Sequence, residues 1–135
     1  MLTDYATALA TFRPVKARPI GEAELRGRLV TLQARMVRDA IRAVWLDASS
    51  ALTYFTGLSL GASERIHGAL VPSAGGVIYV SPQFEAPKLR SLLRIPGEIA
   101  VWEEDENPYH LIATLVAGLA DLRWTRPRLS PLPMP

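Results

Sequence analysis

Residues 65–80 read RIHGALVPSAGGVIYV, with two apolar runs on either side of a Pro-Ser-Ala-Gly-Gly segment. Valine, isoleucine and tyrosine favour strands, and a glycine-rich segment between two such runs is typical of a hairpin turn. The stretch therefore predicts two antiparallel strands, over residues 65–71 and 77–80. Gly75 and Gly76 lie between strands and lack the spacing of a phosphate-binding loop, so we interpret them as turn residues.

Three elements are predicted before this hairpin. Between residues 21 and 40, apolar side chains recur every three or four positions with charges between them, which indicates an amphipathic helix on a core. Residues 42–47, RAVWLD, contain β-branched and aromatic members and predict a buried strand. A short helix over residues 51–55 follows, because Ser49-Ser50 can cap its start and Gly57 can end it in a left-handed conformation. The apolar positions of the first helix are Leu25, Leu29, Leu32, Met36 and Ala40.

Three more elements are predicted after the hairpin. Ser81-Pro82 suits a helix start, but Pro87 shifts the expected start of the regular helix, which then covers residues 86–93. Residues 98–102 predict a strand. Residues 107–119 begin with Asn-Pro, an N-cap followed by a first-turn proline, and predict a helix. Because helices and strands alternate around a hairpin, the sequence predicts an α/β domain with a mixed sheet.

Composition points to one soluble globular domain. The chain has 135 residues, of which 49% are hydrophobic and 21% charged, and a chain of this size can bury a core without disulfides or metals. The absence of cysteine excludes thiol catalysis and cysteine zinc sites. The net charge is only +2. Residues 13–42 are locally basic, but without an aromatic platform or a binding motif they indicate a solvated helix face, so no nucleic-acid partner is predicted.

The two ends of the chain differ from the middle. Residues 1–12 lack the features of a secretory signal, and the longest apolar run, residues 111–120, is about half the length of a bilayer span. We therefore expect a cytoplasmic protein without a membrane partner. The predicted organisation is an N-terminal extension over residues 1–20, a folded domain over residues 21–120, and a Pro/Arg-rich tail over residues 121–135, which we expect to be disordered.

The sequence contains no self-sufficient active site. His67, in a predicted strand, and His110, in a predicted helix, belong to no metal-binding pattern and are interpreted as packed or surface residues. The acidic run at residues 103–106 lacks the ligand spacing of a calcium loop and is interpreted as a solvated turn. None of Ser49, Ser50, Ser63 and Ser73 lies in a G-x-S-x-G setting.

The segment ALTYFTGL, residues 51–58, resembles the Y-(Y/F/L)-(T/S)-G segment of the amino-terminal domain of creatinase/prolidase-type metallopeptidases. The resemblance covers about residues 22–119 and implies a three-layer α/β fold, a mixed sheet flanked by helices with a ribonuclease H-like motif. It leads us to expect Tyr54 and Phe55 in the core rather than at a substrate. Further matching segments, in order, are Arg28-Leu29, Met36, residues 43–46, residues 63–65, residues 70–72, and residues 102–104 before Asn107-Pro108.

The resemblance implies a non-catalytic role. In that family the amino-terminal domain helps to build dimers and to wall the active site, whereas Xaa-Pro hydrolysis belongs to a following domain with two divalent metals, such as manganese. After Asp121 the sequence has no acid and no histidine, so no metal ligand can be assigned and we expect no cofactor. We interpret the chain as a truncated or frameshifted product, inactive alone, whose partners are a second copy or a full-length homologue. The alternative is a stand-alone peptide- or protein-binding module.

Arg65 is the one site residue that the resemblance implies. It occupies the place of an arginine that, in relatives such as creatinase, reaches the neighbouring subunit and contacts the substrate carboxylate; a guanidinium can bind a carboxylate with two parallel hydrogen bonds. The alternative is that Arg65 pairs with Glu64 or another surface acid. An apolar surface patch is also expected where a catalytic domain would pack.

Overall fold

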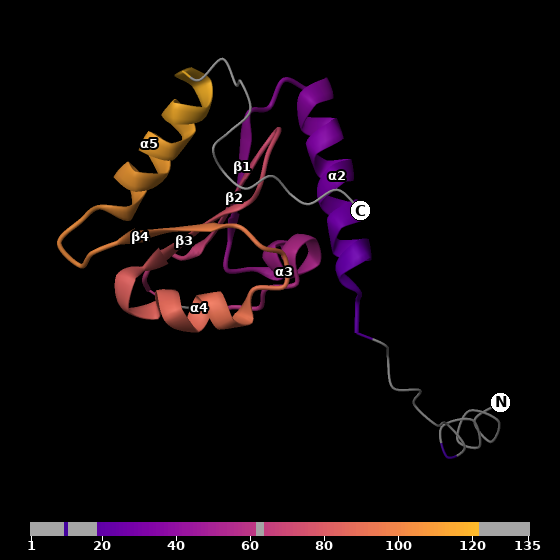
Figure 1. Cartoon of the computed structure of the whole chain (residues 1–135), viewed down its shortest axis with the longest axis horizontal. Helices are drawn as coiled ribbons and strands as arrows, with labels where there is room; N and C mark the ends of the chain where they lie inside the picture. The colour runs from indigo at the N-terminus through magenta and orange to yellow at the C-terminus, as the bar shows by residue number, and fades with distance from the viewer. Residues whose placement is uncertain (1–9, 11–18, 62–63, 122–135) are drawn as a thin grey trace.

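A computed structural model describes residue 10, residues 19–61 and residues 64–121, and within these it places four strands in one mixed sheet (Figure 1). The strand order is β1-β2-β3-β4, with β1 antiparallel to β2, β2 antiparallel to β3, and β3 parallel to β4. The α/β prediction with a mixed sheet is thereby confirmed. The strands are β1 (Ala43–Asp47), β2 (Gly68–Pro72), β3 (Ile78–Pro82) and β4 (Glu98–Trp102).

The predicted hairpin forms, with Ala69 opposite Tyr79 and a turn that contains Gly75 at a φ of 94°. That positive φ suits glycine because it has no Cβ. The first strand begins later than predicted: residues 65–67 precede β2. Strand β1 ends at Asp47, which pairs with Gly68, so the residues before Gly68 have no residue of β1 to pair with.

Three helices cover one face of the sheet and enclose the main core. They are α2 (Glu22–Arg38), α3 (Ser50–Thr56) and α4 (Ala86–Leu92). Alternate residues of the strands point to this face, because side chains of a strand alternate between its two sides. The buried residues of this core are Leu25, Leu29, Met36, Leu46, Leu52, Leu58, Ala69, Val71, Val77, Tyr79, Leu89 and Ile95.

In the described part of the chain, one helix, α5 (Pro108–Asp121), covers the opposite face. Figure 1 shows α5 and α2 on either side of the strands. The second core is small: its buried members are Leu70, Ile78 and Leu119, against which Leu115 and Val116 also pack. Helices on both faces make three layers, as the family resemblance implied.

Local sequence accounts for the helix ends. The Ser49 hydroxyl accepts a hydrogen bond from the Leu52 N–H at 3.4 Å, and Gly57 ends α3 with a φ of 75°, as predicted. The carboxamide oxygen of Asn107 accepts from the Tyr109 N–H at 2.9 Å at the start of α5.

One predicted helix start is wrong. Ser81 and Pro82 are the last residues of β3, where they pair with β4, and a 3₁₀ turn (Gln83–Glu85) separates them from α4. The later start at Ala86 is confirmed. Parallel pairing with β4 extends the strand through Pro82, which the local sequence does not reveal.

The N-terminal extension, apart from residues 10, 19 and 20, and the tail from residue 122 onward lie outside the described residues, so these predictions stay untested. Among the described residues, no helix is both long enough and apolar enough to cross a membrane.

Candidate functional site

Arg65 lies at the surface with its side chain held by two other segments. Its Nη2 is 2.5 Å from Oε1 of Glu104, which follows β4, and its guanidinium carbon lies 4.7 Å from the centroid of the Phe84 ring, in the 3₁₀ turn. The side chain is 46% exposed. Arg65 therefore pairs with a surface acid, which is the alternative given for it above. Its guanidinium nevertheless stays accessible to solvent.

The backbone beside Arg65 is also fixed. The Trp102 indole N–H donates to the Ile66 carbonyl at 3.0 Å, and Trp102 is only 7% exposed. Since Trp102 ends β4, this hydrogen bond ties the segment before β2 to the far end of the sheet. The backbone next to Arg65 is thus held in place by the sheet, and this helps to fix where its guanidinium lies.

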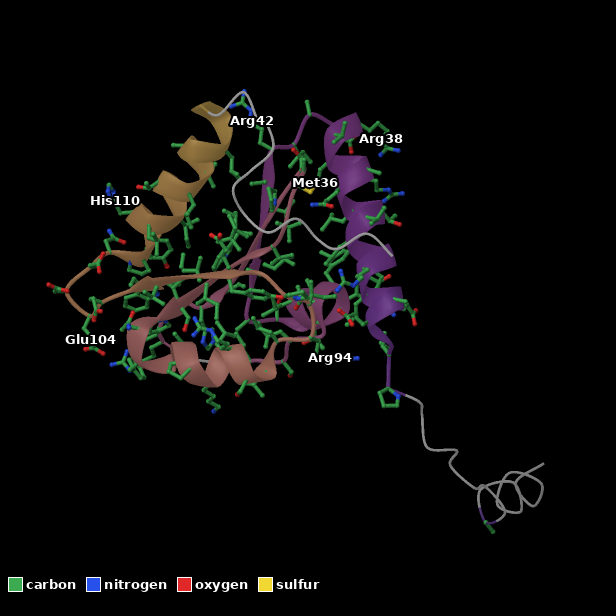
Figure 2. The ribbon with its side chains drawn as sticks, viewed as in Figure 1. Met36, Arg38, Arg42, Arg94, Glu104 and His110 are labelled. Atoms are coloured by element: carbon green, nitrogen blue, oxygen red, sulfur yellow. The ribbon has the colours of Figure 1, made fainter. Side chains whose placement is uncertain are left out.

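The acidic run at residues 103–106 forms the turn between β4 and α5. The carboxylate of Glu106 accepts from the Glu103 N–H at 3.1 Å, and all four acids are exposed. Figure 2 shows Glu104 at the end of the molecule far from α2. The predicted solvated turn is confirmed, and Glu104 within it forms an ion pair with Arg65.

The two histidines lie in different environments. His67 is 8% exposed, with Nε2 3.2 Å from the Gly61 carbonyl and Nδ1 3.5 Å from Oε2 of Glu85. His110 is exposed on α5 and points away from the sheet (Figure 2). Within the described part of the chain, no three His, Asp or Glu side chains come together to hold a metal ion, so these residues do not fit a two-metal centre.

Tyr54 is not in the core as expected, since 52% of it is exposed. The Arg28 guanidinium carbon lies 4.1 Å above the Tyr54 ring, and Nη1 of Arg28 donates to the Tyr54 carbonyl at 2.9 Å. A cation over the ring face replaces apolar burial for this side chain. Phe55, by contrast, is half-buried and packs against the main core, as predicted.

A groove of about 620 Å³ between α2 and α3 runs past this pair, with Leu32 and Phe55 in its lining and Arg35 at its border. The sequence analysis missed it. The spacing of Arg28, Leu32 and Arg35, on one face of α2, was the available signal, but a helix face alone does not reveal which helix lies opposite.

Comparison with known proteins gives the same assignment at the level of family and fold. The family model described as "Creatinase/Prolidase N-terminal domain" matches residues 28–124. An uncharacterized peptidase of Schizosaccharomyces pombe is 26% identical over 103 residues, which cover 66% of this chain and 23% of that protein.

Two solved structures share the fold. Prolidase from Thermococcus sibiricus superimposes with a TM-score of 0.61 at 26% identity, over 70% of this chain and 25% of its own. Dipeptidase PepE from Mycobacterium ulcerans gives a TM-score of 0.64 at 19% identity, over 74% of this chain and 28% of its own. The chain thus spans about a quarter of the length of these relatives. By the match over most of its length, this chain belongs to the creatinase/prolidase N-terminal domain family.

Proposed function

We propose that this domain is the non-catalytic partner in an Xaa-Pro peptidase assembly, where it associates with a second copy or a full-length homologue and helps to wall the partner's active site. The domain that it matches is the non-catalytic one of its family. Hydrolysis would depend on metal-binding residues in a catalytic domain, because the described residues offer no metal ligand set. We also propose that the chain by itself neither takes up manganese nor cleaves an Xaa-Pro bond.

The observation that carries this proposal is the exposed, oriented guanidinium of Arg65. Glu104 and Phe84 hold it from two different segments, so little side-chain entropy would be lost when it meets a carboxylate. An exposed ion pair contributes little to stability. The arrangement is therefore better suited to contact with a partner or a substrate than to holding the fold together.

The apolar surface next to Arg65 supports an interface there. Phe84 is 56% exposed, and an exposed aromatic ring beside an arginine is the composition that recurs at the energetic centre of protein interfaces. We propose that Phe84 is the apolar anchor of the contact and that Arg65 extends beyond it toward the partner's site.

Sedimentation velocity of the purified chain tests the association. We expect a concentration-dependent dimer whose dissociation constant rises at least about tenfold in Phe84→Ser, as for loss of an interface anchor. Tyr109→Ser is the matched control, since Tyr109 is 66% exposed on α5 and lies outside the proposed contact. A chain that stays monomeric at high concentration, or an equal effect of both variants, would contradict the proposal.

Kinetics of a chimera tests the role of Arg65. The full chain replaces the amino-terminal domain of the Thermococcus sibiricus prolidase, and Gly-Pro hydrolysis is measured with manganese beside the unfused chain, for which no turnover is expected. Arg65→Ala should raise KM about tenfold with a smaller change in kcat, because a lost carboxylate contact weakens substrate binding. An unchanged KM would assign Arg65 to the surface ion pair alone.

The groove between α2 and α3 favours a second candidate, a stand-alone peptide-binding module. Its exposed Tyr54 and the cationic Arg35 could take an apolar side chain and a carboxylate of a peptide. Calorimetric titration of the monomeric chain with Gly-Pro and with longer peptides distinguishes the two functions: saturable binding that Tyr54→Ala abolishes and Phe84→Ser leaves intact would favour the module.

A further inference from the structure

A second cavity, of about 300 Å³, lies between the end of β3, Glu85 with helix α4, His67 before β2, and residues 59–61. Its volume is at the lower end of the range for small-molecule pockets. None of Arg65, Phe84 and Glu104 lines it, so it is separate from the surface proposed above. Its lining residues are Ser59, Leu60, Gly61, His67, Ser81, Glu85, Lys88, Leu89 and Leu92.

One side of the cavity gathers hydrogen-bond acceptors. Nε2 of His67 lies 3.2 Å from the Gly61 carbonyl, to which it can donate only when it carries the proton. Nδ1 of the same ring lies 3.5 Å from Oε2 of Glu85, and the His67 side chain is 10% exposed, so a carboxylate lines the cavity beside a nearly buried imidazole. A primary ammonium has three donors and no lone pair, which suits it to the oxygens of the Glu85 carboxylate.

Lys88, three residues after Glu85, supplies a positive charge to the cavity lining. Lys88 is exposed at the rim of the cavity, and within the described residues no ion pair of Lys88 is found. An ammonium that is not paired inside the protein is available to a ligand carboxylate. The cavity is thus lined by one carboxylate and one ammonium group.

The remaining lining consists of three leucines together with Ser59, Gly61 and Ser81. Leu89 is 4% exposed, Leu60 is half-buried, and Leu92 is 43% exposed at the edge of the cavity. Covering Leu92 with a short aliphatic group would remove apolar surface from water, which is favourable. A ligand that complements Glu85, Lys88 and the leucines is a small molecule with an ammonium, a carboxylate and an apolar side chain.

We propose that this cavity binds a free α-amino acid with an aliphatic side chain, with its ammonium group on Glu85, its carboxylate on Lys88 and its side chain on the three leucines. The site goes beyond the peptidase role and does not depend on it.

Titration of the ¹⁵N-labelled full chain, followed by NMR, tests the site with three probes. L-Leucine carries both charges, isovalerate lacks the ammonium, and isoamylamine lacks the carboxylate. We expect saturable shifts of the His67 and Leu89 amides with L-leucine, and binding about tenfold weaker for each analogue, the effect of losing one charge-assisted hydrogen bond. Isovalerate binding as tightly as L-leucine would overturn the amino-acid assignment, as would no saturable shift up to about 10 mM, where even a millimolar site would be mostly filled.

Variants assign the two charges. Glu85→Gln keeps the side-chain shape, and its affinity for L-leucine should fall to the affinity of the wild-type protein for isovalerate. The affinity of Lys88→Gln for L-leucine should fall to the affinity of the wild-type protein for isoamylamine. Arg90→Gln is the control, because Arg90 is exposed on the same helix and does not line the cavity. The spectrum of each free variant reports whether it is folded. Equal weakening in Arg90→Gln, or full affinity in Lys88→Gln, would refute the proposal.

Discussion

At the residue scale, Tyr79 joins the sheet to the segment that leads into β4. Its ring is fully buried in the main core, and its hydroxyl donates to the Ile95 carbonyl at 2.6 Å. Burial disfavours the phenolate and raises the pKa of Tyr79 above its ordinary value. The hydroxyl is thus a structural donor, held neutral by the core around it.

Tyr79→Phe should lower the free energy of unfolding by about 1–2 kcal/mol at pH 8, because the buried Ile95 carbonyl loses its donor. In the unfolded chain Tyr79 ionises near pH 10, and in the folded protein only at higher pH. The unfolded state therefore loses the proton first, and the stability contributed by the hydroxyl falls as the pH rises above about 10. Denaturant unfolding at several pH values should show the difference between the two proteins shrinking.

Tyr109→Phe provides the control for this pH series, because Tyr109 is 66% exposed. The free energy of unfolding of Tyr109→Phe should stay close to that of the wild-type protein, because the Tyr109 side chain is not buried. A Tyr79→Phe difference that grows above pH 10 would contradict the assigned role of the hydroxyl.

At the element scale, two glycines in different surroundings have opposite roles. Gly97 precedes β4, and a Cβ added there would lie 2.3 Å from the Val77 carbonyl oxygen and 2.9 Å from the Tyr79 ring. Gly27 lies inside α2, where an added Cβ would meet nothing within 4 Å. Close approach of β3 to the segment before β4 thus requires Gly97, whereas the helix does not require Gly27.

Gly97→Ala should destabilise the fold by about 3 kcal/mol, since the clash is with backbone and the parallel pairing of β3 with β4 must shift. Gly27→Ala should stabilise it by about 0.4–1 kcal/mol, because alanine restricts the unfolded chain and favours the helix. Thermal and urea unfolding measure both changes. If Gly27→Ala were as destabilising as Gly97→Ala, the described environment of α2 would be wrong.

At the scale of the whole molecule, the two faces of the sheet are stabilised unequally. Among the residues whose side chains the structure describes, twelve buried ones make up the core under α2, α3 and α4, and three make up the core under α5. Hydrophobic stabilisation grows with the apolar area removed from water. Helix α5 is therefore the described helix with the smallest buried core beneath it.

Hydrogen exchange should detect this inequality. We expect amides in the middle of α5 to exchange at least about tenfold faster than those of α2, whose Leu25, Leu29 and Met36 are nearly inaccessible to solvent, because weakly packed elements open with a smaller free energy. Mass spectrometry of exchanging fragments gives the comparison. Equal protection of the two helices would show that the sheet and both layers open as one cooperative unit.

The sequence by itself determined the helices, most of the strands and the α/β class. Spacing of leucines in α2, the cap at Ser49, the turn at Gly75 and the Asn-Pro start of α5 all act within a few residues, so local physical chemistry is sufficient to predict them. Arg65 came from the family resemblance of the sequence and not from such local chemistry.

Only the tertiary structure decided where strands end and which side chains meet. The start of β2 at Gly68 and the end of β3 at Pro82 follow from the strands that pair with them. Exposure of Tyr54 depends on Arg28, 26 residues away in the sequence. The cavity with Glu85 and Lys88 exists because residues 59–61 pack beside α4. Such contacts join distant parts of the chain, and their energies depend on the whole packing arrangement, so no local pattern encodes them.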